Sequence, residues 1–253
     1  MTENKTRKIA SFLRWRLVPV RSMERFSRLS AKTFRPLPKP VGKVGIEVDR
    51  LGLTVSPTIA SADVNAMRDL FLPRVELSRK TSRNHPFVNL VRAEDLSADN
   101  LLMKYAFSKD VLDVAMDYFG GRVTLSGLQA LYSFPEDDGP FVYLEKEASK
   151  KVGRSMIVRR IEDMQMFKES GGVETKRVYG KAGKSVLVDP AAVYHYGGRC
   201  KYPRLAIFAT FNSDIPFDGS SSLISHNKTR IATLIKAMRP NLDGNAVGRM
   251  LML

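Results

Sequence analysis

The sequence holds three histidines, His85, His195 and His226, which are its first candidates for acid–base chemistry or metal binding. None of them is followed two positions later by Asp or Glu. The chain therefore has no His-x-Asp or His-x-Glu pair, the usual first half of a two-histidine, one-carboxylate iron site. It also lacks the HExxH, GxSxG, Walker and GxGxxG motifs. Any site must be built from side chains that are distant in the sequence.

One stretch, residues 181–211, combines an imidazole and a guanidinium with the pattern of two strands. A glycine turn leads into a predicted strand at 184–189, a loop carries His195, and a Gly-Gly pair follows. Arg204 then opens a strand at 205–211 that is apolar on both faces, as a central strand should be. An imidazole nitrogen can ligate iron, and a guanidinium can hold a carboxylate with a bidentate fork. In a jelly roll, the two side chains would face the same interior.

The elements that must position this pair change from helices to strands along the chain. Residues 62–72, with Ser61 as a candidate N-cap, predict a helix, and so does the segment from Ser108 to a Gly-Gly stop. This order predicts an α+β fold with a β-sandwich or jelly-roll centre. The other predicted elements are strands at 122–125, 128–133, 140–144 and 176–179 and helices at 149–168 and 229–238.

The stretch 181–211 resembles the C-terminal half of the phytanoyl-CoA dioxygenase-like family of Fe(II)/2-oxoglutarate oxygenases. Members typically show a glycine turn, an apolar strand ending in Asp, then His-x-Gly and Pro-Arg-Leu. Here Asp189, His195 with the following glycine, and Arg204 stand in that order. The resemblance implies that His195 is the distal iron ligand and that Arg204 pairs with the far carboxylate of 2-oxoglutarate. It extends more loosely over residues 85–216.

One part of the family pattern is missing. In the family, a strand like the one predicted at 128–133 leads to a His-x-Asp pair of iron ligands and a further strand before a Gly-Pro turn. Here five residues separate Ser133 from Gly139. The resemblance therefore implies an incomplete double-stranded β-helix (jelly-roll) core with flanking helices. Strands missing from such a core would leave sheet edges with unpaired backbone groups. The acidic run 136–138 is typical of a turn, and a replacement metal ligand is its alternative role.

The remaining candidates have structural interpretations. His85 and His226 lie in polar segments and are interpreted as surface or structural histidines. Asp189 is expected to begin the turn after its strand, and Cys200 to be an inert thiol. For the two proposed site residues, the alternatives are a structural loop histidine and a surface arginine.

The net charge of +15 is concentrated at the N-terminus. Residues 1–43 hold twelve of the 41 Lys and Arg residues and two of the 26 acidic residues. They combine a basic amphipathic segment with a Pro-rich linker, a pattern that is most typical of a solvated or partly docked arm. Contact with an anionic membrane surface is the alternative, and it is favoured over binding to nucleic acid. We divide the chain into this arm and linker, 1–43, and one domain, 44–253.

Composition limits the class of protein. The 253 residues are 43% hydrophobic, and none of their apolar runs is long enough to span a bilayer. A cytoplasmic globular protein with peripheral membrane contact is therefore predicted, and its one cysteine excludes an intrachain disulfide. Two functions stay open. One is a dioxygenase that uses Fe(II) and 2-oxoglutarate to hydroxylate an unknown small molecule, and the other is a pseudoenzyme that binds a carboxylate or a partner without redox chemistry.

Overall fold

The computed structural model describes residues 37–76, 88–135, 138–152, 163–213 and 220–252. Within these residues, the protein combines helices with short strands in small antiparallel sheets. The predicted mixture of helix and strand is therefore confirmed. The N-terminal arm up to residue 36, His85 and the acidic residues at 136 and 137 lie outside the described residues.

The described strands form two three-stranded sheets and one two-stranded sheet. One three-stranded sheet has the order β2-β3-β8, the other has the order β5-β4-β7, and β1 pairs with β6. The strands are β1 (Leu53–Ser56), β2 (Val88–Asn89), β3 (Val123–Ser133), β4 (Asp138–Tyr143), β5 (Lys176–Arg177), β6 (Ser185–Val188), β7 (His195–Arg199) and β8 (Arg204–Ser213).

Helices precede, separate and follow these strands. They are α3 (Lys43–Leu51), α4 (Ser61–Phe71), η1 (Leu72–Arg74), η2 (Ala93–Asp95), α6 (Leu101–Ala106), η3 (Lys109–Asp113), α7 (Val114–Tyr118), α8 (Lys146–Val152), α9 (Asp163–Glu169), α10 (Ser222–His226), α11 (Lys228–Met238) and α12 (Gly244–Leu251).

The helices predicted from apolar periodicity agree with the structure in their middle turns and differ at their ends. The helix predicted at 62–72 is α4, in which Ser61 is the first helical residue and Ala60 is the N-cap. The helix that starts after Ser108 begins with a π-helical turn and continues as α7. Both glycines that follow α7 have positive φ, which ends the helix as expected. The two ends of the helix predicted at 149–168 belong to α8 and α9, and residues 153–162 between them lie outside the described residues.

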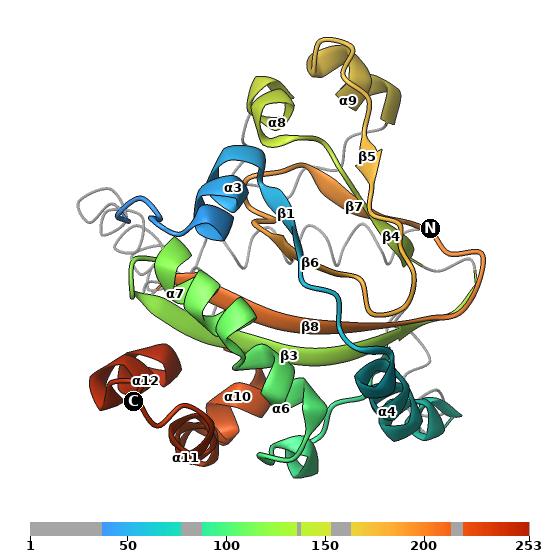
Figure 1. The fold of residues 1–253 in the computed structure, drawn as a ribbon. Coiled ribbons are helices and arrows are strands. Elements are labelled where there is room, and N and C mark those ends of the chain that lie inside the picture. The colour runs from blue at the N-terminus through green and yellow to red at the C-terminus, as the bar shows by residue number, and fades with distance from the viewer. Residues whose placement is uncertain (1–36, 77–87, 136–137, 153–162, 214–219, 253) are drawn as a thin grey trace, which may run out of the picture.

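β3 takes the place of the two short strands predicted at 122–125 and 128–133. Its pairing with β8 changes register between Leu125 and Gly127, so the polar break in the sequence is a β-bulge within one strand. β8 was predicted to be central, but among the described strands it pairs with β3 alone and lies at the edge of its sheet. Its apolar character on both faces has a different cause, because helices cover one face and the second three-stranded sheet lies beyond the other (Figure 1).

The main core lies between the β2-β3-β8 sheet and the helices on one side of it. Leu125, Leu128 and Ala130 of β3 belong to one buried cluster with Ile231 and Ile235 of α11. Burying a side chain of this size stabilises the fold by about 1.5–3 kcal/mol relative to exposure. The sheet is therefore fixed against the helices by one face, and the other face is left for other contacts.

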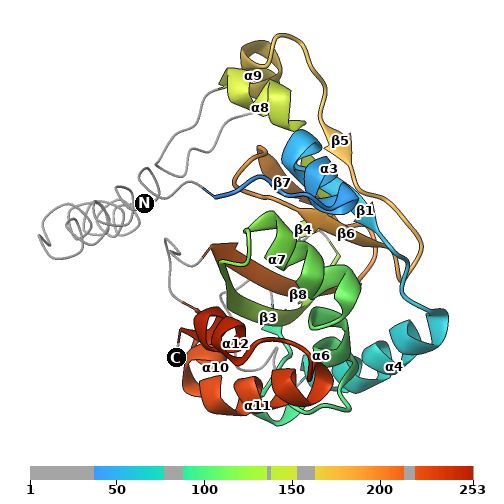
Figure 2. The ribbon, with the colours of Figure 1, turned by 60° about the vertical axis from the view of Figure 1, so that its left-hand side comes forward.

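A smaller cluster covers the other three-stranded sheet. α8 and α9 supply most of its buried residues, and two tyrosines, one just before β7 and one within it, pack against it. Its members are Leu144, Ala148, Val152 and Met166, with Val173, Tyr194 and Tyr196 packed against them. The protein is thus layered, with α10, α11 and α12 outside one sheet and α8 and α9 beyond the other (Figures 1 and 2).

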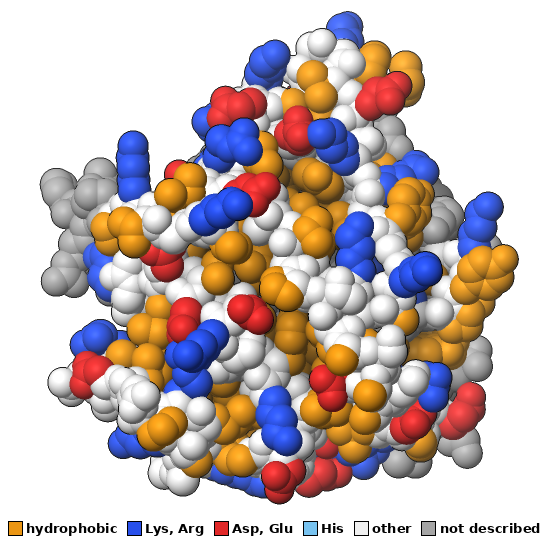
Figure 3. Space-filling model, viewed as in Figure 1, with side chains coloured by type: hydrophobic (Ala, Val, Ile, Leu, Met, Phe, Trp, Pro, Cys, Tyr) orange, Lys and Arg blue, Asp and Glu red, His pale blue; other side chains and the backbone are white. Residues whose placement is uncertain are grey.

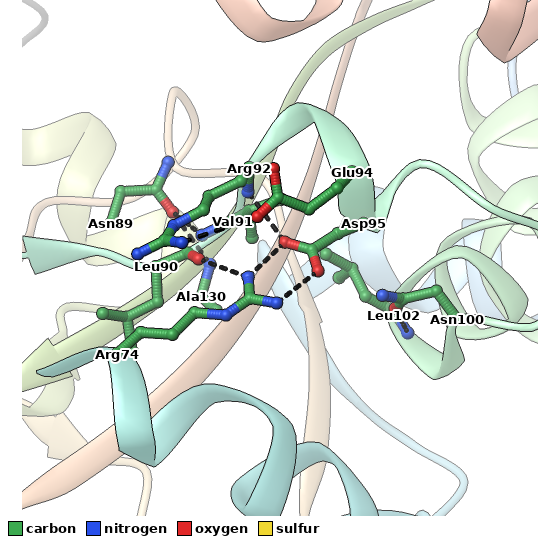
Figure 4. A network of polar contacts seen from close by, with 10 residues as sticks. All are labelled: Arg74, Asn89, Leu90, Val91, Arg92, Glu94, Asp95, Asn100, Leu102 and Ala130. Atoms are coloured by element: carbon green, nitrogen blue, oxygen red, sulfur yellow. Dashed lines mark hydrogen bonds and ion pairs between the residues drawn. The ribbon is translucent and has the colours of Figure 1, made fainter.

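A buried ion pair holds β2 and the segment after it against η1 (Figure 4). Arg74 donates to both carboxylate oxygens of Asp95, at 2.5 and 2.8 Å, and to the carbonyl of Leu90 at 3.0 Å. Asp95 also accepts the backbone N–H of Arg92, at 2.8 Å. Both charged side chains are largely buried, and their hydrogen bonds offset the cost of removing them from water.

The end of the Pro-rich linker is bound to the body of the protein. The carboxylate of Asp117 accepts the backbone N–H groups of Val41 and Gly42, both at 3.0 Å. Pro38 lies where a side chain at Gly120 would be, and the positive φ of this glycine also excludes most other residues. The structured body therefore begins within the segment that the sequence assigned to the arm, and it includes at least residues 38–43.

The surface seen in Figure 3 shows Lys and Arg side chains interspersed with Asp and Glu. Such mixed charge gives no extended field of one sign on this face. None of the described helices is long and apolar enough to cross a membrane.

Candidate functional site

The face of the β3–β8 pair that points away from the helices carries Arg204. Leu205 and Ile207 pack against the helical core, so the alternation along β8 turns Arg204, Ala206 and Phe208 to the opposite face. We call this the inner face of β3–β8. Its members on β3 are Thr124, Gly127, Gln129, Leu131 and Ser133, which stand opposite Asn212, Thr210, Phe208, Ala206 and Arg204 of β8.

The face of the β4–β7 pair that points away from α8 and α9 carries His195. Tyr194 and Tyr196 pack against the cluster under those helices, so His195 between them points to the other side. Phe141 and Tyr143 of β4 share that side, because Tyr143 stands opposite His195 in the register. We call this surface the inner face of β4–β7.

The two inner faces look toward one another. Figures 1 and 2 place the two sheets in adjacent layers, with the covering helices on their outer sides. Phe208, with 40% of its surface exposed, and the exposed Thr210 and His195 all lie on these faces. Water therefore reaches both faces, and they are not packed tightly against each other. His195 and Arg204 therefore belong to different sheets, and each lies on the face of its sheet that is turned away from the covering helices.

Arg204 is paired in the strand register with a buried hydroxyl. Ser133 stands directly opposite it on β3, on the same face, and only 1% of Ser133 is exposed. Its Oγ has no hydrogen-bond partner among the residues that the structure describes. A buried hydroxyl without a partner costs about 1–3 kcal/mol, and this cost would be recovered by a bound polar group. Thr124, further along the same face, is also buried, and its hydroxyl has no hydrogen-bond partner among the described residues.

His195 lies on a strand, not on the loop that the sequence predicted. It is the first residue of β7, and its ring stacks on Phe141 with centroids 5.3 Å apart and planes 22° apart. Its Nδ1 lies 3.1 Å from the carbonyl oxygen of Val193. A carbonyl can only accept, so Nδ1 is the donor in this contact, and the tautomer with its hydrogen on Nδ1 alone leaves Nε2 as an acceptor. The loop prediction was wrong because the paired glycines that suggested a loop are part of the strand.

The described residues do not provide the ligands that Fe(II) needs. A backbone carbonyl on Nδ1 does orient an imidazole as it is oriented in many metal sites. However, the described part of the chain holds no group of three or more His, Cys, Asp or Glu side chains that could bind a metal ion. A facial site needs three protein ligands, so His195 does not form one with the other described side chains.

The other candidates have structural roles or lie elsewhere. Asp189 forms the turn after β6, as predicted, by accepting the N–H of Ala191, and it also accepts the hydroxyl of Tyr118 at 2.7 Å. Cys200 is buried and bonded to a backbone carbonyl, as an inert thiol would be. His226 is exposed at the end of α10, on the helical side of the β3–β8 sheet (Figure 1). These three do not contribute to the inner faces.

Three residues of the inner faces were missed in the sequence. The sequence marks Ser133 only as the end of a predicted strand, Phe141 only as part of the strand predicted at 140–144, and Gly197 only as half of a loop-like pair. Their register is what makes them relevant, since Phe141 stands opposite Gly197 and Ser133 opposite Arg204. Strict alternation from Arg204 and His195 along their strands would have identified the face, but not the strands that pair with them.

Comparison with known proteins adds no relative. No family model matches the chain, and a search of curated proteins finds no significant match.

Proposed function

We propose that this protein is an oxygenase-like jelly-roll domain that binds a small carboxylate between its two three-stranded sheets without iron chemistry. In a jelly roll, a two-stranded ribbon folds over, so its outer strand pair lies in one sheet and its inner pair in the other. The nested pairing of β3 with β8 and of β4 with β7, in different sheets, supports this assignment. The order of these pairs along the chain also agrees with the resemblance.

The observation that carries the proposal is the pairing of Arg204 with Ser133 on the inner face. A guanidinium offers a bidentate donor fork, and a carboxylate is the group that matches it best. The buried Oγ of Ser133, which lacks a partner among the described residues, would gain one from the same ligand. Two neighbouring donors from adjacent strands therefore favour a carboxylate at this point.

The absence of a fitting donor set is the reason for assigning binding rather than oxidation. The described side chains supply one imidazole to the inner faces where the related oxygenases use three ligands. The protein would then be a pseudoenzyme that keeps the acid-binding half of an oxygenase site. We expect this site to bind 2-oxoglutarate, and succinate serves as a second dicarboxylate for comparison.

Ser133→Ala gives the sharpest test, because it separates binding from folding. Removing a buried hydroxyl without a partner should leave the free energy of unfolding equal or higher, while affinity for 2-oxoglutarate falls about tenfold. Arg204→Gln should remove the binding that calorimetry detects in wild-type protein with EDTA present. Arg230→Gln, on an exposed position of α11, is the matched control and should bind as the wild type does.

Two results would overturn the proposal. One is that wild-type protein binds neither dicarboxylate, or that Arg204→Gln binds both unchanged. The other is that purified protein with Fe(II), ascorbate and 2-oxoglutarate forms succinate in stoichiometric excess, since this would show that the protein turns over as an oxygenase.

A further inference from the structure

We infer that the outer side of β5 and the connection that follows it form a binding surface for single-stranded nucleic acid. The residues that make this surface are Arg177, Tyr179, Lys181 and Lys184, and all four are exposed. We call this group the β5 basic surface. Lys and Arg side chains lie over the connection between β5 and β6 in Figure 3. The inference goes beyond the proposed function, and the two can be tested independently.

The excess positive charge of the body is concentrated in one part of the chain. Residues 175–213 contain seven Lys and Arg residues and a single acidic residue, Asp189. The rest of the domain 44–253 contains 22 basic and 23 acidic residues, so it is close to neutral. Asp189 already accepts the hydroxyl of Tyr118 and the N–H of Ala191. The strands β5 to β8 and their connections therefore carry a local positive charge that attracts a polyanion.

Tyr179 is held between two of the cations. A guanidinium N–H of Arg177 donates to the Tyr179 hydroxyl at 3.4 Å, and the ammonium of Lys184 donates to the Tyr179 backbone carbonyl. Tyr179 nevertheless keeps 60% of its surface exposed. One cation therefore lies at the hydroxyl end of the ring and another near its backbone end, and solvent reaches the ring between them.

Strand pairing places this tyrosine on the outer face of its sheet. Arg177 stands opposite Val142 of β4, whose partner on β7, Tyr196, packs against the cluster under α8 and α9. Backbone pairing with β4 continues through residue 178, so alternation brings Tyr179 to the same face as Arg177, as their hydrogen bond also requires. The β5 basic surface therefore points away from the inner face of β4–β7.

A nucleic acid strand would use both the ring and the charges of this surface. Bases of every kind stack on exposed aromatic rings, and the phosphates beside each base pair with Lys and Arg. Cations at both ends of the Tyr179 ring match this arrangement. An acidic peptide would use the charges alone. A bilayer surface favours apolar side chains that enter it, and Tyr179 is the one large hydrophobic side chain that residues 176–184 expose.

The test compares two oligonucleotides of equal charge, one with bases and one without. Fluorescence anisotropy with full-length protein is expected to show that an oligothymidylate of about twelve nucleotides binds about tenfold more tightly than an abasic strand of the same length. The basic arm attracts the phosphates of both strands, so the ratio of the two affinities is the measured quantity. Tyr179→Leu should bring this ratio close to one, and Tyr179→Phe should keep it.

The contribution of the cations is tested by salt dependence. Arg177→Gln and Lys184→Gln should each weaken the binding of both strands and reduce the slope of log affinity against log salt concentration by about 0.7. Lys236→Gln, at an exposed position of α11, is the matched control and should change neither quantity. Thermal stability and the affinity for 2-oxoglutarate should stay at their wild-type values in all of these variants.

Three results would overturn the inference. The first is equal affinity of the wild type for the two strands, and the second is a preference for bases that persists in Tyr179→Leu. The third is that Tyr179→Leu loses flotation with phosphatidylserine vesicles while its oligothymidylate binding is unchanged, since the surface would then contact lipid. Absence of dicarboxylate binding in the wild type would overturn the proposed function and leave this inference standing.

Discussion

The imidazole of His195 lies flat against the ring of Phe141, with the two centroids 5.3 Å apart. This contact joins the first residue of β7 to the middle of β4 and turns the histidine toward the inner face of its sheet. The ring contact and the carbonyl of Val193 therefore orient this histidine. It could serve either as a ligand or as a structural residue, and the number of neighbouring ligands decides between these roles.

Metal binding by His195 is the first point to measure. We expect calorimetry with Mn(II), Co(II) or anaerobic Fe(II) to show no tight stoichiometric binding to the wild-type protein, because the described residues supply one imidazole where three ligands are needed. His195→Ala is the comparison variant. Tight binding of one metal ion to the wild type that is lost in His195→Ala would contradict the absence of iron chemistry.

The ion pair between Arg74 and Asp95 is expected to stabilise the fold strongly. Asp95→Asn leaves a largely buried guanidinium without its counterion, which should lower the free energy of unfolding by about 3 kcal/mol in urea denaturation. The hydrogen bond to Asp95 raises the pKa of Arg74 above its usual value, so this difference should persist at alkaline pH. Glu94→Gln, which removes an exposed partner of Arg92, is the control and should cost under about 0.5 kcal/mol.

The ion pair between Lys176 and Glu145 should contribute little and in a pH-dependent way. The two charged atoms are 2.5 Å apart on an exposed surface, so Lys176→Met should lower the free energy of unfolding by less than about 1 kcal/mol at neutral pH. The hydrogen bond to Glu145 raises the pKa of Lys176 above its usual 10.5. The contribution is therefore fully present below pH 10.5 and is lost as the pH rises through the raised pKa. If the difference in free energy of unfolding between the wild type and Lys176→Met increased above about pH 11, this result would contradict the predicted pH dependence.

Asp117 is expected to hold the linker to the body. Asp117→Asn can accept one backbone N–H in place of two, and should lower the free energy of unfolding by about 1 kcal/mol. It should also increase hydrogen exchange at the amides of Val41 and Gly42. Asp69→Asn, which breaks an exposed pair with Arg68, should change neither quantity. Unchanged exchange at both amides in Asp117→Asn would show that the carboxylate does not hold the linker.

The basic arm remains a prediction for anionic membrane surfaces. Residues 1–36 carry ten Lys and Arg residues and two Glu residues, whereas the segment from Pro38 onward is bound to the body. Deletion of residues 1–36 should therefore abolish flotation with phosphatidylserine-containing vesicles at low salt and leave thermal stability unchanged. Equal flotation of the shortened and full-length proteins would reject the arm as the membrane contact.

The sequence by itself determined the elements whose signals are local. The apolar stripe and cap of α4, the glycine stop after α7 and the strand that Arg204 opens all depend on residues within a few positions of one another. The same local rules misread β7 as a loop, because a pair of glycines weakens the strand pattern that its pairing with β4 enforces.

Only the tertiary structure decided which side chains form the candidate site. The pairings of Ser133 with Arg204 and of Phe141 with Gly197 each join residues more than fifty positions apart, and strand register is set by burial of the opposite face. The sequence could name the imidazole and the guanidinium from their types and spacing. It could not show that the Ser133 hydroxyl is buried or that the rings of Phe141 and His195 stack, because both depend on pairing between distant segments.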